Sequence, residues 1–434
     1  MLARVVYTIL LYLLTPIVLI RLGLRGLHNR AYWRRWRERF GFAPPMQIPG
    51  VIWLHAVSVG EVNALAPLIE KLLARHPHMA LMVTTGTPTG SARVRQLFGN
   101  KVHHAYLPFD LPCAVRRFLV RTRPVLGIIA ETEIWPNLYT FARRYGVPML
   151  IVNARLSIRS MRGFAILPGV RLIRIALASV AEVLAQSEVD AERYIRLGAH
   201  QDRVRVVGNM KFDLAPSPAL RSEAEQFRRA LGPARRIWIA ASTHEAEERA
   251  VVRAHQRVLA AFPDALLLVA PRHPERFRTM VQCAREAGLE VATRSGDRQP
   301  GIDTRCFVVD TLGELMQFYA VADVAFVGGS LAPCGGHNVL EPAALGVPVL
   351  VGPHTENFAE IVDALLAAGA ARREPDADAL GEAVAALLRD PDSRRRMGEA
   401  GLRVIQRGRG ALEEILDAVE RQLRTRMPPI SAAR

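Results

Sequence analysis

The segment Val324–Val351 constrains the possible folds more than any other part of the chain. Two short apolar runs, Val324–Val327 and Val347–Val351, flank a glycine-rich loop and a stretch of helical character from Asn338 to Gly346. Glycine allows a loop to turn tightly and its backbone to approach a ligand closely. This order predicts a strand–loop–helix–strand unit of a parallel sheet, with the start of the helix beside the strand ends, where phosphate groups bind.

Glu341 has two possible roles in that unit. It lies one turn into the predicted helix, where its carboxylate could accept hydrogen bonds from both hydroxyls of a ribose. Alternatively, Asn338 and Glu341 fit a capping box, whose only role is to start a helix. The segment alone does not decide between these two roles.

Apolar runs alternate with helical patterns through most of the chain. In the first half, runs that predict buried strands lie at Val51–Val57, Ala80–Thr85, Val102–Leu107, Val125–Ala130, Pro148–Val152, Val180–Gln186 and Val204–Val207. After Asp213–Pro218 the pattern restarts, with predicted strands at Arg236–Ala241, Leu266–Ala270, Val291–Thr293 and Phe307–Val309. Predicted helices include Glu61–His76, Glu245–Ala261, Glu275–Ala287, Glu314–Ala322, Ala359–Ala368, Ala377–Leu388 and Ser393–Leu423.

This alternation predicts an α/β protein with parallel, doubly wound sheets. We expect an N-terminal segment of residues 1–45, ending at the linker Pro44-Pro45, and two Rossmann-like domains at residues 46–212 and 213–434. Two such domains are expected to face a cleft, because ligands of open α/β sheets bind at the carboxyl ends of the strands.

The charge balance favours an anionic partner. The chain has 57 Lys and Arg against 41 Asp and Glu, a formal net charge of +16, which suits nucleic acid, an anionic membrane or a phosphorylated substrate. No recognised nucleic-acid motif accompanies the arginines, so no nucleic-acid partner is predicted. The four cysteines form no CxxC pair or His/Cys cluster, which favours a reducing compartment and argues against a zinc site. No P-loop is present, which argues against an ATPase.

The N-terminal segment has the pattern of a membrane anchor. Val5–Ile20 carries no charge and is slightly shorter than the roughly 20 residues that span a bilayer. Arginines and aromatic residues follow it, whereas a signal peptide has its charges before the apolar run. We therefore predict an uncleaved anchor, either spanning or monotopic, that contacts anionic lipids and holds the rest of the chain in the cytoplasm.

Glu61 is the first candidate for chemistry. It follows the first predicted strand in the sequence Ser58-Val59-Gly60-Glu61 and lies in the first turn of a helix. The positive end of a helix favours an ionised carboxylate, and such a carboxylate in a cleft can take a proton from an attacking hydroxyl. The alternative is the ordinary first-turn chemistry of a helix.

Charged residues also end two neighbouring strands of the first half. Glu131 and Glu133 follow the strongest strand, and Arg155 follows the next one. Arg155 is a candidate for binding an acceptor phosphate or carboxylate. A salt bridge from Arg155 to one of the glutamates is an equally compatible reading.

Strand ends of the second half predict an anion site. Ser242 and Thr243 lie between a strand and a helix, where backbone amides and hydroxyls suit a phosphate, although helix capping would explain them too. Arg272 and His273 end the next strand. Together with Gly335 they predict one anion-sized site.

Asp376-Ala377-Asp378 matches the DxD pattern that holds a metal in some sugar-nucleotide enzymes. It directly precedes a predicted helix, and an N-cap explains it better. No metal or other cofactor is predicted.

Eight motifs occur along the chain in this order: HAVSVGEVNA (His55–Ala64), TTGTPTG (Thr84–Gly90), ETEIWPN (Glu131–Asn137), NARLS (Asn153–Ser157), GNMKFD (Gly208–Asp213), APRHPERF (Ala270–Phe277), DTLGEL (Asp310–Leu315) and GGHNVLEPAALGVPVLVGP (Gly335–Pro353). Together they resemble the 3-deoxy-D-manno-octulosonic acid (Kdo) transferases of Gram-negative lipopolysaccharide synthesis. The resemblance extends from the anchor almost to the C-terminus.

The resemblance implies a GT-B glycosyltransferase of the bacterial inner membrane, with its catalytic domains on the cytoplasmic face. It implies CMP-Kdo as donor, a lipid A precursor of the lipid IVA type as acceptor, inversion at the anomeric carbon and no bound metal. It makes Glu61 the catalytic base and places the acceptor on the first domain and the CMP-sugar on the second.

The expected site residues follow from the motifs and from the strand ends. The donor side comprises Lys211, Ser242, Thr243, Arg272, His273, Gly313, Glu314, Leu315, Asn338 and Glu341. The acceptor side comprises Glu131, Glu133 and Arg155. Two other functions fit the same residues less well, namely another GT-B enzyme such as a UDP-sugar transferase or 2-epimerase, and a membrane-tethered anion-binding protein without turnover.

Overall fold

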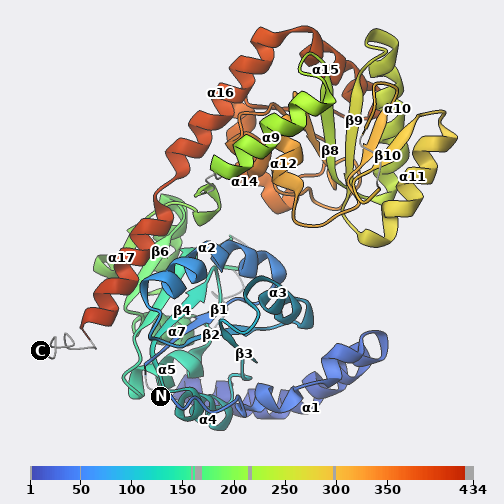
Figure 1. Ribbon diagram of the computed structural model, residues 1–434. Coiled ribbons are helices and arrows are strands. Elements are labelled where there is room, and N and C mark those ends of the chain that lie inside the picture. The colour runs from blue at the N-terminus through green and yellow to red at the C-terminus, as the bar shows by residue number, and fades with distance from the viewer. Residues whose placement is uncertain are drawn as a thin grey trace, which may run out of the picture. The chain divides into compact units, whose positions relative to one another are not determined.

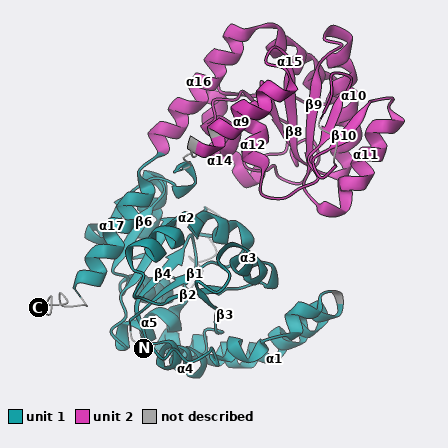
Figure 2. Ribbon diagram, in the orientation of Figure 1, with its two compact units in different colours: residues 1–213, 409–434 teal, residues 214–408 magenta. Residues whose placement is uncertain are grey.

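The structure is a computed structural model that describes residues 2–48, 50–157, 160–161, 169–213, 218–296 and 300–425. The chain forms two compact units, one of residues 1–213 and 409–434 and one of residues 214–408 (Figure 2). Figure 1 labels the helices and strands of each unit.

The first unit is built on a seven-stranded parallel sheet with the strand order β3-β2-β1-β4-β5-β6-β7. Its strands are β1 Val51–His55, β2 Leu81–Thr85, β3 His103–Tyr106, β4 Pro124–Ala130, β5 Met149–Ala154, β6 Glu182–Ala185 and β7 Val204–Val206. Its α-helices include α1 Leu2–His28, α2 Val59–Arg75, α3 Pro88–Phe98, α4 Pro112–Thr122, α5 Pro136–Arg144, α7 Gly169–Leu177, α8 Glu188–Leu197 and α17 Ala411–Arg424. Short 3-10 helices are η1 Arg30–Trp33, η2 Trp36–Phe40, η3 Gln201–Arg203 and η4 Met210–Phe212.

Helices cover both faces of this sheet, which explains the continuous apolar runs in its strands. Successive side chains of a strand point to opposite faces. Trp53 of β1 therefore packs against Phe118 of α4, with 5.1 Å between ring centroids, whereas Ile52 and Leu54 belong to the opposite core cluster, which contains Leu65 of α2.

The second unit contains another seven-stranded parallel sheet, of order β10-β11-β9-β8-β12-β13-β14. Its strands are β8 Ile237–Thr243, β9 Leu266–Pro271, β10 Val291–Thr293, β11 Cys306–Val308, β12 Val324–Val327, β13 Val349–Val351 and β14 Ala371–Arg373. Its α-helices are α9 Pro218–Leu231, α10 Glu245–Ala261, α11 Phe277–Glu286, α12 Leu315–Val321, α13 Leu340–Ala344, α14 Ala359–Ala367, α15 Ala377–Arg389 and α16 Pro391–Gly408, with the 3-10 helices η5 Pro274–Arg276 and η6 Glu356–Phe358.

Every predicted strand is present, with ends that shift by a few residues, and the α/β fold with two parallel sheets is confirmed. The edge strand β14 was not predicted, because its sequence Ala371-Arg372-Arg373 has no apolar run. It pairs only with β13 among the described strands, so most of its length needs no burial.

The predicted helix Ser393–Leu423 is two helices, α16 and α17. Its apolar period continues across Gly410, but that residue has a φ of 108°, which breaks the helix. The carboxylate of Asp213 accepts hydrogen bonds from the backbone N–H of Gly410 at 2.7 Å and of Leu412 at 2.8 Å, and so caps α17.

Helix α17 belongs to the first unit, whereas the sequence assigned all of residues 213–434 to one domain. Ile415, Leu416 and Val419 are fully buried in the core cluster that also contains Leu65 of α2. The apolar face of α17 is thus covered by the first sheet unit, a contact between distant parts of the chain that the helical pattern cannot show.

The segment before β1 is also more closely integrated than predicted. The proposed boundary at residue 45 separated the basic segment from the first domain, but Ala43 and Met46 are buried in its core. The carboxylate of Glu38 accepts a hydrogen bond from the backbone N–H of Tyr106 in β3, at 2.9 Å. The unit therefore begins well before the predicted boundary.

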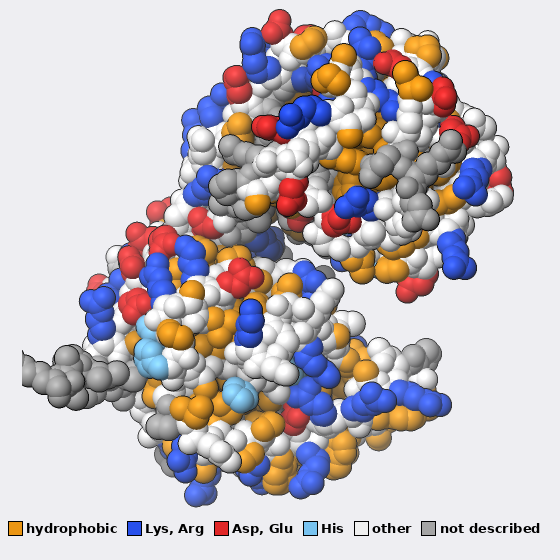
Figure 3. Space-filling view, viewed as in Figure 1, with side chains coloured by type: hydrophobic (Ala, Val, Ile, Leu, Met, Phe, Trp, Pro, Cys, Tyr) orange, Lys and Arg blue, Asp and Glu red, His pale blue; other side chains and the backbone are white. Residues whose placement is uncertain are grey.

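Helix α1 contains one stretch, Leu2–Leu27, that is long and apolar enough to cross a membrane by length and composition. Apolar and basic side chains gather on it (Figure 3), and many of its large apolar side chains are exposed. Its N-terminal part contacts the rest of the first unit, because the hydroxyl of Tyr7 donates a hydrogen bond of 3.0 Å to the carboxylate of Asp110.

Two deletions should therefore behave differently. Removal of residues 2–28 is expected to leave a folded protein, because Asp110 keeps its bonds from the backbone N–H groups of Asn137 and Leu138. Removal of residues 2–47 also takes away the buried Glu38 and Met46 and should lower the melting temperature markedly. Thermal unfolding compares the two variants.

The shorter deletion should also lose sedimentation with vesicles at high salt, where the remaining arginines are screened. Equal melting temperatures for both deletions, or unchanged sedimentation without α1, would contradict this description of the N-terminal segment.

Candidate active site

The predicted residues of the first unit lie at the carboxyl ends of three neighbouring strands. Glu61 follows β1 in the first turn of α2, Glu131 follows β4 and Arg155 follows β5, and these strands are adjacent in the sheet. The hydroxyl of Thr132 donates a hydrogen bond to the backbone carbonyl of Arg155, which ties two of these strand ends together.

The side chain of Glu61 caps its own helix. Its carboxylate accepts hydrogen bonds from the backbone N–H of Val57 at 2.8 Å and from the hydroxyl of Ser58 at 3.1 Å. The hydroxyl of Ser58 in turn accepts one from the N–H of Glu61 at 3.4 Å. Glu61 therefore has the structural role of a first-turn helix residue, and this role is compatible with one in catalysis.

The electrostatic setting of Glu61 differs from the expectation. The positive helix end was predicted to favour the ionised form, but burial raises the pKa of the Glu61 carboxyl to about 7. The hydrogen bonds from Val57 and Ser58 oppose this rise, and the charges of Glu131 and Glu133 add to it. A carboxyl group with this pKa is half ionised near neutral pH and is well matched to taking up a proton.

The raised pKa of Glu61 predicts how the stability of the protein changes with pH. The folded state holds the Glu61 proton up to about pH 7, whereas the ordinary value is 4.5, so ionisation between these values costs folding free energy. Glu61→Gln removes this cost. The variant should gain up to roughly 1–3 kcal/mol relative to the wild type as the pH rises from about 4.5 to 8.

Thermal unfolding at several pH values measures this gain. Glu70→Gln, which changes an exposed carboxylate of the same helix, is the matched control and should show no such trend. A difference between Glu61→Gln and the wild type that is the same at all pH values would rule out a raised pKa.

The backbone around this site is strained. Glu131 has a φ of 55° and Asn153, at the end of β5, has a φ of 51°. Such left-handed conformations are costly for residues other than glycine and are concentrated at functional sites. The hydroxyl of Tyr194 donates a hydrogen bond of 2.8 Å to the carbonyl of Glu131, which helps to hold this conformation.

Lys211, which is predicted as a donor residue, lies in the first unit beside a residue that is predicted for the acceptor side. It belongs to the first unit, and its ammonium group is 3.8 Å from the carboxylate of Glu131. The carboxylate of Glu133 accepts a hydrogen bond of 2.8 Å from the indole N–H of Trp135, and burial raises its pKa. Lys211 thus supplies a cation beside one of three clustered carboxylates.

The ends of β8, β9 and β12 lie side by side in the second unit, where the sequence predicts an anion-sized site. Thr243 of β8 is paired with Pro271 of β9, and the backbone N–H of Arg272 donates to the carbonyl of Thr243 at 2.9 Å. The N–H of Gly328, after β12, donates to the carbonyl of Ala241 at 2.8 Å. Their role in binding a ligand stays a prediction.

Two details of these strand ends point to a ligand site. Ser242 has a φ of 57°, another left-handed conformation outside glycine. The hydroxyl of Thr243 is buried and has no hydrogen-bond partner within the described part of the chain. Buried polar groups are nearly always hydrogen-bonded, so an unpaired one beside a strand end is consistent with a partner that binds there.

Three histidines lie close to Arg272, and for two of them, His244 and His337, the sequence predicted no role. The Nε2 atoms of His244 and His337 are 2.8 Å apart, and their rings stack with 5.1 Å between centroids. His273 packs against His244 at 5.4 Å. Burial, together with the nearby charge of Arg272, lowers the pKa of His337 to about 4. The only local signal was that His337 directly precedes Asn338.

Asn338 and Glu341 do not form a capping box. The helix begins two residues later than predicted, as the five-residue α13, and the carboxylate of Glu341 accepts a hydrogen bond of 3.0 Å from the side-chain amide of Asn338. The side-chain oxygen of Asn338 accepts one from the N–H of Leu340 at 3.1 Å. Burial raises the pKa of Glu341, whereas Asn338 and the nearby Arg272 lower it.

This geometry makes side chains, and not the start of the helix, the expected partners of a phosphate. A five-residue helix offers little dipole for a phosphate. Arg272 and Glu341 are instead close enough to interact electrostatically, which places a cation and a hydrogen-bond acceptor at one site.

The segment Gly313–Leu315 leads into α12. Gly313 has a φ of 92°, and the carboxylate of Glu314 accepts two hydrogen bonds from the guanidinium of Arg294, at 2.7 and 3.2 Å, and one from Thr311. These bonds lower the pKa of Glu314. The carboxylate therefore fixes the segment, and Leu315 begins the helix.

Asp376 is an N-cap, as predicted. Its carboxylate accepts hydrogen bonds of 2.9 Å from the backbone N–H groups of Asp378 and Ala379. Asp378 forms a salt bridge of 2.8 Å with Arg257. Among the described residues that were searched, no group of three or more His, Cys, Asp or Glu could hold a metal ion.

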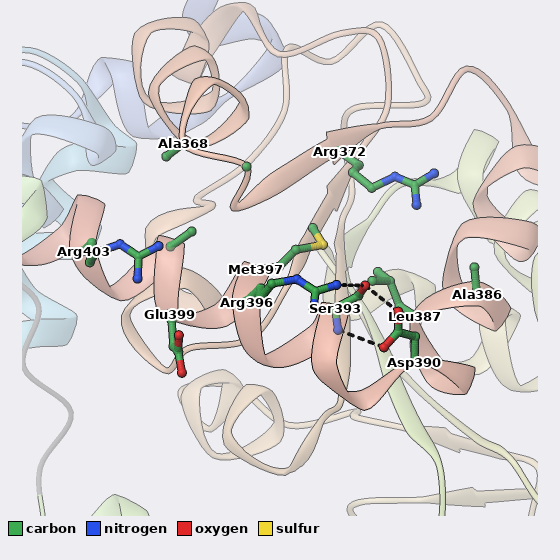
Figure 4. A pocket seen from close by; sticks show the side chains of 12 residues that line it. Ala368, Arg372, Ala386, Leu387, Asp390, Ser393, Arg396, Met397, Glu399 and Arg403 are labelled. Carbon is green, nitrogen blue, oxygen red and sulfur yellow. Dashed lines mark hydrogen bonds between the residues drawn. The ribbon is translucent and has the colours of Figure 1, made fainter.

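A cavity of about 520 Å³ lies away from these residues, between α15, α16 and the start of β14. It contains none of the predicted site residues. Figure 4 shows that three of its polar side chains bond to one another, because Asp390 accepts a hydrogen bond from the hydroxyl of Ser393, which in turn accepts one from Arg396. The strand ends, and not this cavity, carry the candidate chemistry.

The fold is that of a known class. Two units, each built on a seven-stranded parallel sheet, have the fold of the GT-B class of glycosyltransferases. The structure resembles UDP-GlcNAc 2-epimerase from Neisseria meningitidis bound to UDP-GlcNAc, with a TM-score of 0.55 and 15% identity over 86% of this chain and 100% of that one. At this identity the likeness concerns the fold alone.

Sequence comparisons define the family. Residues 34–214 match the family described as 3-Deoxy-D-manno-octulosonic-acid transferase (kdotransferase), and residues 298–404 match Glycosyl transferases group 1. A 3-deoxy-D-manno-octulosonic acid transferase from Haemophilus influenzae is 40% identical over 96% of this chain and 98% of its own length. One from Bordetella pertussis is 39% identical over 96% and 99%. The chain belongs to the Kdo transferase family.

Proposed function

We propose that the chain transfers Kdo from CMP-Kdo to a lipid A precursor of the lipid IVA type, with inversion at the anomeric carbon. The observation that carries this proposal is the identity of about 40% to Kdo transferases over nearly the full length of both chains. The geometry of the two strand-end sites supports an assignment of roles within the reaction.

The second unit binds the donor in this proposal. CMP carries one phosphate, whose charge Arg272 compensates together with the backbone and hydroxyls at Ser242 and Thr243. Glu341 accepts hydrogen bonds from the ribose hydroxyls, and the segment Gly313–Leu315 lines the cytidine. A single phosphate with these partners needs no metal ion, so none is part of the proposed reaction.

Glu61 is the base in the first unit. Its carboxylate takes the proton of the acceptor hydroxyl while the hydroxyl oxygen bonds to the anomeric carbon of Kdo. The bond from that carbon to the phosphate oxygen breaks, and CMP leaves with the bonding electrons. One displacement from the opposite face inverts the anomeric centre. Arg155 and Lys211 supply positive charge for the phosphorylated acceptor.

The N-terminal segment suits a lipid acceptor. Its apolar helix and the arginines that follow bind the inner membrane and its anionic lipids, with the catalytic units on the cytoplasmic face. The exposed apolar side chains of α1 support this part of the proposal.

Nucleotide binding and CMP release test the proposal. Calorimetry should show binding of CMP and much weaker binding of UDP, and CMP should be released from CMP-Kdo only when the lipid acceptor is present. Preference for UDP would favour a UDP-sugar enzyme, to which the fold is also similar. Binding of CMP without any acceptor-dependent release would favour an anion-binding protein without turnover.

A further inference from the structure

The carboxylate of Glu247, in the first turn of α10, collects an unusual number of backbone hydrogen bonds. One oxygen accepts from the N–H groups of His244 at 2.9 Å and Gly329 at 2.7 Å. The other accepts from the N–H groups of Ser330 at 3.0 Å, Leu331 at 2.9 Å and Ala332 at 3.2 Å. Glu247 is about 1% exposed, so these five donors replace its hydration.

Four of these bonds join the start of α10 to the glycine loop after β12, and the bond from His244 lies within the start of α10. The two partners are 82 to 85 residues apart in the sequence. Successive backbone N–H groups that point into one concavity form an anion site, and here the protein fills that site with its own carboxylate.

The loop is held from its other side as well. The hydroxyl of Ser330 accepts a hydrogen bond from the N–H of Gly352 at 2.8 Å, and its carbonyl accepts one from the N–H of His354 at 2.9 Å. A Cβ on Gly352 would lie 2.2 Å from the Ser330 carbonyl oxygen, and one on Gly328 would lie 2.7 Å from the Ser242 carbonyl oxygen. These close backbone contacts on both sides leave the loop no room to move.

The position of this loop sets the position of the histidine pair. A Cβ on Gly329 would lie 2.9 Å from the ring of His337, so that ring rests on the loop backbone. The backbone of His244, the other member of the pair, is bound directly to Glu247. One buried carboxylate thus holds both sides of the 2.8 Å contact between the two imidazoles.

We propose that Glu247 is a positioning residue of the donor site. It does not touch the donor, but it holds the Gly329–Ala332 loop against the start of α10 and thereby fixes His244 and His337 beside Arg272. This inference rests on the proposed donor site. Its physical basis is preorganisation, because polar groups that are already fixed need no reordering when the nucleotide binds.

Glu247→Gln tests this role because the amide has nearly the same shape as the carboxylate. Whichever way the amide is turned, its NH2 group faces backbone N–H donors, so at least two of the five hydrogen bonds are lost. Glu248→Gln is the matched control, since Glu248 is equally buried in the same turn but pairs with Arg276 at 2.7 Å instead of the loop. Glu247→Asp keeps the charge and tests for partial rescue.

We expect Glu247→Gln to weaken CMP binding about tenfold or more in calorimetry. The KM for CMP-Kdo should rise while the KM for the lipid acceptor is unchanged. Hydrogen–deuterium exchange should become faster in peptides that cover residues 328–337. Glu248→Gln should change none of these three quantities, and Glu247→Asp should lie between Glu247→Gln and the wild type.

Faster exchange in the loop with wild-type CMP affinity would overturn the inference, because the loop contact would then be structural only. The same holds for equal losses of affinity in Glu247→Gln and Glu248→Gln. If Glu247→Gln does not fold, Glu247→Asp carries the test with the same readouts, and wild-type affinity in that variant together with faster loop exchange would overturn it. Absence of CMP binding by the wild type would instead overturn the donor site itself, and this inference with it.

Discussion

Glu61→Gln should lower the rate of Kdo transfer by about 10²–10⁴-fold, the usual contribution of a general base. The amide cannot take up the proton of the acceptor hydroxyl. Its amide oxygen can still accept the hydrogen bond from the Val57 N–H, and its NH2 group can donate to the hydroxyl of Ser58, so α2 keeps its cap and the protein stays folded. CMP affinity should be unchanged, because the proposed donor residues lie in the unit of residues 214–408.

The pH profile of the wild type gives an independent check on the same group. With its pKa raised to about 7, Glu61 loses its ability to take a proton as the pH falls below that value, so kcat/KM should decline on the acid side of about pH 7. An acid limb near the ordinary glutamate value of 4.5 would mean that another carboxyl group is the base.

Glu131→Gln and Glu133→Gln are the controls for the rate effect, since both carboxylates interact with Glu61. Each should retain much more activity than Glu61→Gln. Full activity of Glu61→Gln alongside an inactive Glu131→Gln or Glu133→Gln would assign the base to the end of β4 and not to α2. The fold description would survive that result, but the proposed mechanism would not.

Arg272→Ala and Glu341→Gln should each weaken CMP binding by roughly tenfold to a hundredfold. Hydrogen bonds to charged groups contribute about 1.5–3 kcal/mol, and about 1.4 kcal/mol corresponds to a factor of ten in affinity. Arg272→Ala leaves the phosphate charge less compensated, and Glu341→Gln replaces a charged acceptor of the ribose hydroxyls with a neutral one.

Calorimetry with CMP measures both effects. Arg278→Ala removes an equally positive and exposed side chain from α11 and controls for long-range charge, so its affinity should stay near that of the wild type. Unchanged CMP affinity in both Arg272→Ala and Glu341→Gln would mean that the contact between Asn338 and Glu341 has only a structural role.

Much of the fold could be predicted because its strands are buried on both faces. The runs Val51–Val57 and Val125–Ala130 are apolar except for His55, and such strands are typical of a parallel sheet covered by helices. Helix α10 was predicted with its observed ends, Glu245 and Ala261. The break at Gly410 was not, because helical periodicity continues on both sides of that residue.

The candidate site could be predicted where it depends on sequence position alone. Residues that follow a strand, such as Glu131 and Arg272, lie at the carboxyl edge of a parallel sheet whatever the details of packing. The five bonds to Glu247 and the contact between His244 and His337 could not be predicted. Four of those five bonds, and the histidine contact, join segments more than 80 residues apart, and no local pattern marks them.

The most direct test of the proposed function is mass analysis of the lipid product. Purified wild-type protein is incubated in detergent with CMP-Kdo and a lipid A precursor of the lipid IVA type. The proposal predicts a product heavier than the acceptor by one or more Kdo residues, formed together with CMP and absent when Glu61 is replaced by glutamine. An acceptor of unchanged mass, with a wild-type protein that is folded and binds CMP, would contradict it.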